Sequence, residues 1–460
     1  MRKKLTIAAL SSVFVFGMAT SALAIHMTET AEPGPVVSMA EKLTLDGQVR
    51  VRGYINKADD EKDSASAQGY DSRVQFGVMA NVAPGASAYI QLETNSGSDD
   101  TYGWGDDGSG NGNTYVGLHS GGYKLGGLDI LQAWINYQPG SVGVKAGHMP
   151  LALGNKVFFD HTGSGDDAIV GYTSFGENTH VAALTIKFDE QATNDSTDDL
   201  DGYVALITHK VGDNLTLGAN ITHLIGGADD GLGELVGGMA MTNIGLTTDF
   251  KTGNISLTGD LEYQTGDYTA TPSTTMDANG YAIRVGGTMD LGAAKVGLLY
   301  GYGSGDDNEN DNDVDTFLNF LTDTNYDTII ANYRAHVPGT FTKYSGLSNL
   351  SLYQVNASTS FTCPISGKDV DLKGAVSYMH LNEDLNTTSD GNDALTTAYA
   401  TQNEDEVGTE LDLIATWHLT PGLDYMVEAA WMATGDVFKI SATDSPDDLY
   451  FLRHRLTLSF

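Results

Sequence analysis

The sequence is poor in cysteine and in positive charge, and each shortage excludes a class of protein or site. It contains a single cysteine, Cys363, in 460 residues, so neither an intrachain disulfide nor a cysteine-based metal site can form. It contains 24 Lys and Arg residues against 60 Asp and Glu residues, which gives a net charge of −36. Because a chain this acidic repels phosphates, we exclude nucleic acid as a general partner.

The chain also lacks a long apolar run beyond its first residues. Residues 2–4 are basic, the stretch to Ala19 is largely apolar, and Ala22-Leu23-Ala24 supplies the small residues of a cleavage site. This pattern predicts a secretory signal peptide over residues 1–24, cleaved near Ala24. An uncleaved N-terminal anchor is the alternative, although the run is shorter than the ~20 residues of a spanning helix. No later run reaches that length, which excludes a helical membrane protein.

Motifs of common catalytic sites are missing as well. The sequence has no Gly-x-Ser-x-Gly nucleophile turn and no His-Glu-x-x-His metal motif, and its histidines are scattered. We therefore expect neither an enzyme nor a bound cofactor. The acidic segment from Asp307 to Asp315 could hold Ca²⁺ through oxygen ligands. A solvated, self-repelling surface loop is the simpler interpretation, and we predict no dedicated metal site.

Alternating polarity is what the chain has in abundance. In its last residues, Tyr450, Leu452 and Leu456 fall on one face of a strand, and Arg453 and Arg455 fall on the other. A similar alternation begins near Leu43 and recurs to the end of the chain. A strand with one apolar face and one cationic face suits a membrane barrel, in which lipid covers the outside and water fills the inside.

Short connections recur at eight places and are separated by longer, acidic segments rich in Gly, Asn and Asp. They lie near 84–85, 139–140, 176–178, 212–214, 252–254, 290–292, 364–367 and 421–422. This asymmetry is typical of periplasmic turns and extracellular loops. Eight turns plus closure of the barrel predict about 18 strands, with 16 as the alternative. A large soluble sandwich or solenoid is a further alternative, but no repeat of 20–50 residues supports a solenoid.

We therefore predict an all-β fold, a transmembrane antiparallel β-barrel of about 16–18 strands over residues 42–460. A short leader at 25–41 precedes it. The chain ends on Phe460, and its last strand resembles the closing strand of bacterial outer-membrane barrels, which typically ends in Phe. In those proteins the assembly machinery reads this residue, so the resemblance implies the same role for Phe460.

Two regions resemble trimeric general porins of the bacterial outer membrane. Residues 70–77 (YDSRVQFG) and 82–93 (VAPGASAYIQLE) resemble their second hairpin. Residues 131–137 (LQAWINY) and 144–151 (VKAGHMPL) resemble the segment that leads into their constriction loop. The resemblance implies a homotrimer in the outer membrane of a Gram-negative bacterium. It also implies that the segment from Leu151 to Ile169 folds into the lumen and narrows it.

Side chains at inward positions predict the chemistry of that lumen. Closure would bring the first two strands beside the last and place five arginines on one arc of the wall, which Lys145 extends: Arg50, Arg52, Arg73, Arg453 and Arg455. The candidate constriction segment carries four polar residues that would face them: Asp160, His161, Asp166 and Asp167. Cations that face carboxylates across a narrow water path create a transverse field that tunes selectivity. Alternatively, the arginines pair structurally with wall acids such as Asp46 and Glu93.

The function that these patterns and the resemblance favour is a water-filled channel for passive diffusion of small hydrophilic solutes and ions. Its other partners would be outer-membrane lipid and the barrel-assembly machinery. The alternative is a structural or conduit barrel that sheathes a partner protein or anchors the cell surface. The constriction segment distinguishes the two hypotheses, because a segment folded inward leaves no room for a protein.

Overall fold

The fold is known from a computed structural model of the chain. It describes residues 37–40, 43–57, 67–95, 102–103, 127–189, 199–226, 238–271, 274–307, 313–321, 328–331, 337, 346–384, 404–439 and 446–460. The predicted signal peptide and most of the predicted leader lie outside these residues. No helix in the described part has the length and apolar character needed to cross a membrane.

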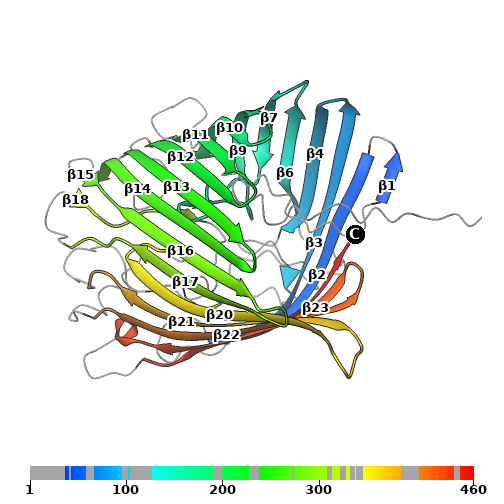
Figure 1. Ribbon diagram of the computed structural model, residues 1–460, viewed down its shortest axis with the longest axis vertical. Helices are drawn as coiled ribbons and strands as arrows, with labels where there is room; N and C mark the ends of the chain where they lie inside the picture. Colours follow the sequence, from blue (N-terminus) through cyan, green and yellow to red (C-terminus); the bar gives the residue numbers. More distant parts are fainter. Residues whose placement is uncertain are drawn as a thin grey trace, which may run out of the picture.

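Eighteen antiparallel strands form the wall of a closed barrel and follow one another in chain order (Figure 1). The wall strands are β2 (Leu43–Lys57), β3 (Ala67–Ala83), β4 (Ala86–Asn95), β6 (Gly127–Tyr137), β7 (Val142–Met149), β9 (Asp166–Phe175), β10 (Thr179–Asp189), β11 (Leu200–Val211), β12 (Leu215–Gly226), β13 (Met239–Thr252), β14 (Ile255–Thr271), β16 (Tyr281–Asp290), β17 (Lys295–Gly303), β20 (Leu350–Thr362), β21 (Asp369–Leu381), β22 (Glu406–Thr420), β23 (Leu423–Thr434) and β24 (Leu449–Ser459). The predicted fold class is confirmed, with 18 strands and not 16.

Short elements lie outside this wall sequence. They are β1 (Val37–Ala40), β5 (Tyr102–Gly103), β8 (Phe159–Asp160), β15 (Thr274–Ala278), β18 (Asp313–Val314), β19 (Phe320–Leu321) and the 3₁₀ turn η2 (Asp436–Phe438). β5 pairs with β3 beyond the end of β4, and β15 pairs with β14 beyond the start of β16. β5 and β15 therefore extend the wall at places where β3 and β14 are longer than the neighbouring wall strands β4 and β16.

The barrel closes where its first wall strand meets its last. Residues 48–57 of β2 pair with 450–459 of β24. The backbones of Gly47 and Phe460 exchange two hydrogen bonds, at 2.9 and 3.0 Å. Residues 43–45 of β2 then pair with β1 along the same edge. Part of the predicted leader therefore continues the line of β24, and the closing edge is paired on both sides of Phe460.

All eight predicted turn sites connect consecutive wall strands, and they share one end of the barrel, which we call the turn end. Gly85, between β3 and β4, shows the local chemistry that such turns require. Its φ of 74° lies in the left-handed region that glycine adopts without strain. The opposite end, which we call the loop end, carries the longer connections.

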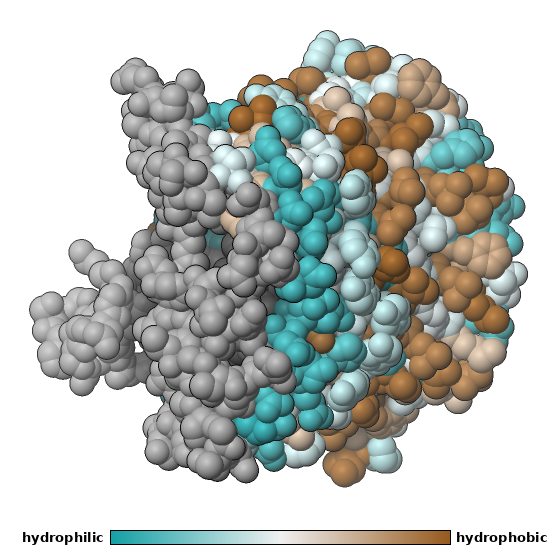
Figure 2. Space-filling view, turned by 90° about the vertical axis from the view of Figure 1, so that its left-hand side faces the viewer, coloured by the Kyte–Doolittle hydropathy of each residue, from teal (hydrophilic) through white to brown (hydrophobic). Residues whose placement is uncertain are grey.

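The two faces of the wall differ as the alternation predicts. Large apolar side chains such as Ile221, Leu246 and Leu298 are exposed on the outer face, at 47%, 49% and 66%. Figure 2 shows the resulting apolar band, bordered on its left by a hydrophilic band. Successive residues of a strand point to opposite faces, so the intervening residues point into the lumen.

Two connections fold into the lumen and pack against each other. The first lumen segment, 150–165, joins β7 to β9. The second lumen segment comprises the described parts of the connection from β17 to β20, which are residues 304–307, 313–321, 328–331, 337 and 346–349. β8 of the first pairs in parallel with β19 of the second. Their apolar side chains, including Phe158 and Phe317, are buried in one cluster with inward residues of the wall. The predicted constriction segment thus folds inward over 151–165, and residues 166–169 begin β9.

Candidate functional site

Five arginines line one arc of the inner wall. β2 carries Arg50 and Arg52, β3 carries Arg73, and β24 carries Arg453 and Arg455. The strand register places Arg50 directly opposite Arg73, and Arg52 directly opposite Arg455. We refer to these five side chains as the arginine arc. Like charges directly opposite each other on a sheet repel, so the arc requires nearby compensation.

Carboxylates on the neighbouring strands supply part of that compensation. Nε of Arg52 lies 2.6 Å from Oδ2 of Asp71, and Arg453 donates to Glu428 on β23. Nη1 of Arg73 lies 3.9 Å from Oε2 of Glu93 on β4. Sequence reasoning named Glu93 but missed Asp71 and Glu428. The signal for both was available, since each occupies an inward position next to an arginine strand.

The arc nevertheless keeps an excess of positive charge. Within the described residues, Arg50 and Arg455 form no ion pair, and the buried Nε of Arg50 has no hydrogen-bond partner. Asp46, which sequence reasoning offered as a partner, instead accepts a hydrogen bond from the Tyr89 hydroxyl at 2.9 Å. The alternative of purely structural pairing therefore holds for some of the five arginines and not for all of them.

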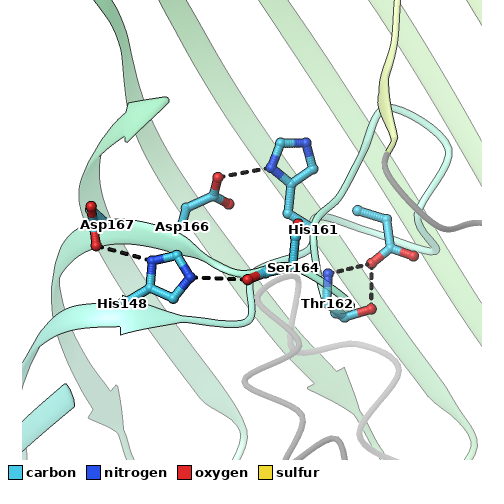
Figure 3. A network of polar contacts seen from close by, with 7 residues as sticks. His148, His161, Thr162, Ser164, Asp166 and Asp167 are labelled. Atoms are coloured by element: carbon cyan, nitrogen blue, oxygen red, sulfur yellow. Dashed lines mark hydrogen bonds and ion pairs between the residues drawn. The ribbon is translucent and has the colours of Figure 1, made fainter. Parts of the chain in front are cut away.

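The predicted acids of the first lumen segment are held by their own neighbours (Figure 3). Asp160 is 3% exposed, lies 3.1 Å from Nζ of Lys156 and accepts two hydrogen bonds from Thr162. Nδ1 of His161 lies 2.8 Å from Oδ1 of Asp166. The imidazole of His161 also packs on Phe159, with ring centroids 4.6 Å apart. These contacts fix the shape of the segment.

Asp167 does not line the pore, which corrects the sequence prediction. Adjacent residues of a strand point to opposite faces, so Asp166 points inward and Asp167 outward. The Asp167 side chain is 72% exposed, and its Oδ1 lies 3.0 Å from Nδ1 of His148, its cross-strand neighbour. Nε2 of His148 meets the backbone oxygen of Ser164 at 2.9 Å (Figure 3). His148 and Asp167 therefore hold the end of the first lumen segment at Ser164 from the outer face of the wall.

Lys145 points inward but does not extend the arginine arc. It is 5% exposed, and its Nζ lies 3.7 Å from the ring centroid of Trp134. Strand pairing leads from Lys145 across β6 and β4 to Asn81 on β3, eight residues from Arg73. At ~3.3 Å per residue this offset is about 26 Å along the strand. The resemblance of residues 144–151 to porins gave no information about this distance between Lys145 and the arginine arc.

Sequence reasoning also missed the wall residues that hold the two lumen segments. Asp260 on β14 accepts hydrogen bonds from the backbone N–H and the side-chain amide of Asn155, at 3.1 and 2.6 Å. Gln264, on the same strand, exchanges two hydrogen bonds with the backbone of Leu318, at 2.9 and 2.6 Å. A buried polar side chain at an inward position of a wall strand is the signal that could have identified them.

The acidic segment considered for Ca²⁺ lies largely outside the described residues, because 308–312 are not among them. Within the described part, no group of three or more His, Cys, Asp or Glu side chains has the arrangement of a metal site. Ca²⁺ binding therefore stays an untested hypothesis.

Comparisons with known proteins agree with this architecture. The family described as Gram-negative porin matches residues 14–318, more than half of the chain, and the family described as Alginate export matches residues 234–449. No curated protein sequence matches the chain significantly.

Solved structures with the same fold are outer-membrane proteins. OccAB1 of Acinetobacter baumannii has a TM-score of 0.57 at 12% identity, over 94% of this chain and 99% of that one. OccK5 (OpdH) of Pseudomonas aeruginosa has a TM-score of 0.52 at 12% identity, over 90% and 98%. The outer membrane protein opdK from Pseudomonas aeruginosa has a TM-score of 0.53 at 11% identity, over 92% and 100%. At these identities the likeness shows the fold.

The structure of this chain is a closed 18-strand barrel with an apolar outer band and five arginines on one arc of its inner wall. The chain belongs to the Gram-negative porin family, and it is an outer-membrane channel for passive diffusion of small solutes.

Proposed function

We propose that this porin favours small anionic solutes, and that the arginine arc recognises them. The observation that carries the proposal is that the five guanidinium groups of the arc have only three carboxylates within ion-pair distance among the described residues, those of Asp71, Glu93 and Glu428. Guanidinium groups bind carboxylates and phosphates with paired N–H donors. Arg52 and Arg73 keep 16% and 24% of their side chains exposed, so each can contact a solute while it holds its wall partner.

The conduit alternative is less well supported. A barrel that sheathes a partner protein needs an open lumen, whereas two segments of this chain occupy the lumen and bury apolar side chains there.

A second candidate solute follows from the match to the Alginate export family. Alginate is a polyanion, and the arginine arc has the charge to attract one. Current block by an oligouronate, compared with block by a neutral oligosaccharide of equal length, tests this candidate. A block that does not depend on solute charge would remove it.

The ion preference of the purified channel is expected to change with salt. The net charge of −36 gathers cations at the mouth, whereas the arginine arc favours anions inside. Salt screens the exposed mouth more strongly than the enclosed arc, because the Debye length falls from ~10 Å at 0.1 M to ~3 Å at 1 M. We expect cation preference at low salt that weakens or reverses at high salt. Reversal potentials in asymmetric KCl at two mean concentrations measure it, and a preference independent of salt would contradict the proposal.

A further inference from the structure

A carboxylate on another sector of the wall holds the second lumen segment. Glu410 is an inward residue of β22 and is 0% exposed. Its Oε1 accepts hydrogen bonds from the backbone N–H groups of Ile329 and Ile330, both at 2.7 Å, and its Oε2 accepts one from Ala331 at 2.9 Å. Three successive N–H groups around one anion form a nest, a strong and directional site for a carboxylate.

The turn that Glu410 binds is built for this contact. The hydroxyl of Thr328 donates to the backbone oxygen of Ala331 at 3.0 Å, which closes the turn at 328–331. Ile329, Ile330 and Ala331 are 4%, 0% and 1% exposed. Because these amides are buried, their donors depend on the carboxylate. An apolar residue in place of Glu410 would leave three buried donors without an acceptor.

The second lumen segment is also anchored on other sectors of the wall. Gln264 of β14 binds Leu318, five strand steps around the wall from β22. At ~4.8 Å per step these strands lie about 24 Å apart along the wall. Leu347 packs against Gly301 and Gly303 of β17, where a Cβ would lie 2.6 Å or less from it. The described parts of this segment are therefore held at separate sectors of the wall.

We propose that Glu410 is a positioning residue of the channel, one that sets the open width of the lumen by fixing the 328–331 turn. The inference concerns the channel itself and does not depend on the proposed preference for anions. The Gln264 contact and the packing of Leu347 hold other parts of the segment, so that loss of Glu410 frees this turn without releasing the whole connection. The free turn would leave a wider and fluctuating path.

Two substitutions test the proposal in single-channel recordings. Glu410→Ala removes all three acceptor contacts, and Glu410→Gln keeps the shape but turns an N–H₂ group toward a backbone N–H. We expect Glu410→Ala to raise the mean conductance roughly twofold, with frequent steps between current levels, because conductance follows the narrowest width of the pore. Glu410→Gln should show the same steps with a smaller rise. Unchanged conductance and noise in both folded variants would overturn the proposal.

The matched control is Glu262→Gln. Glu262 is an inward residue of β14, equally buried at 0% exposure, and it accepts a hydrogen bond from the Asn243 side chain of the wall. Its replacement removes a buried carboxylate without touching the 328–331 turn, so conductance should not acquire steps. Heat-modifiable migration on a gel verifies that each barrel is folded.

Hydrogen exchange of the unmodified protein provides a second test of the proposal, one that does not depend on any variant. We expect the amides of 329–331 to exchange as slowly as those of the wall strands. Exchange at the rate of an open loop would overturn the inference even if no variant folds. An anion preference that is absent while these amides are protected would count against the proposed function and would leave the contact of Glu410 with residues 329–331 unaffected.

Discussion

Replacing Arg52 and Arg455 together with glutamine is expected to shift the channel toward cations by roughly three- to tenfold in permeability ratio. The two residues face each other across the closing seam, and the change leaves Asp71 without its ion pair. A unit charge ~8 Å from an ion contributes about 2 kcal/mol at an effective dielectric of 20 before salt screening, and 1.4 kcal/mol is a factor of ten. Reversal potentials in asymmetric KCl at low mean salt measure the shift.

The matched control for this prediction is Lys145→Gln. It removes an inward cation that lies against Trp134 and away from the arginine arc. We expect it to change the permeability ratio much less than the double arginine substitution. Equal shifts in both proteins would show that the effect comes from total charge and not from the arc. No shift in either protein would show that the arc does not lie in the conducting path.

Phe460→Ala is expected to lower the amount of folded barrel in the outer membrane much more than it changes conductance. The aromatic ring of Phe460 lies over Gly47, where a Cβ would come within 2.7 Å of its Cζ. Truncation removes partly buried apolar area worth about 1 kcal/mol, together with the terminal aromatic residue that the resemblance assigns to assembly. The folded fraction is measured by heat-modifiable migration of outer-membrane extracts.

Phe361→Ala is the control for that experiment. Phe361 lies near the turn end of β20 and is 45% exposed, close to the 37% of Phe460. If terminal position matters, Phe361→Ala should keep a nearly normal folded yield. An unchanged folded yield in Phe460→Ala, together with a fall in conductance, would contradict the prediction.

The sequence alone determined the wall. Alternation with a period of two assigns each residue of β2 and β24 to a face, so the pattern by itself places Arg50 and Arg453 inside the barrel. Turn chemistry is equally local: Pro84-Gly85 and Pro421-Gly422 mark strand ends because their backbone preferences depend on no distant partner. Counting such turns gave about 18 strands and left 16 as the alternative, which the structure excludes.

The tertiary structure decided everything that depends on contacts between distant segments. The approach of Arg52 to Arg455 exists only because the barrel closes with one particular register. The prediction at Asp167 was wrong because β9 begins at Asp166, and only the packing of 151–165 determines where that strand starts. The contact of Glu410 with residues 329–331 has no local pattern in the sequence. A nest of backbone amides forms when a connection folds against a wall strand, and its stability depends on burial that no single segment supplies.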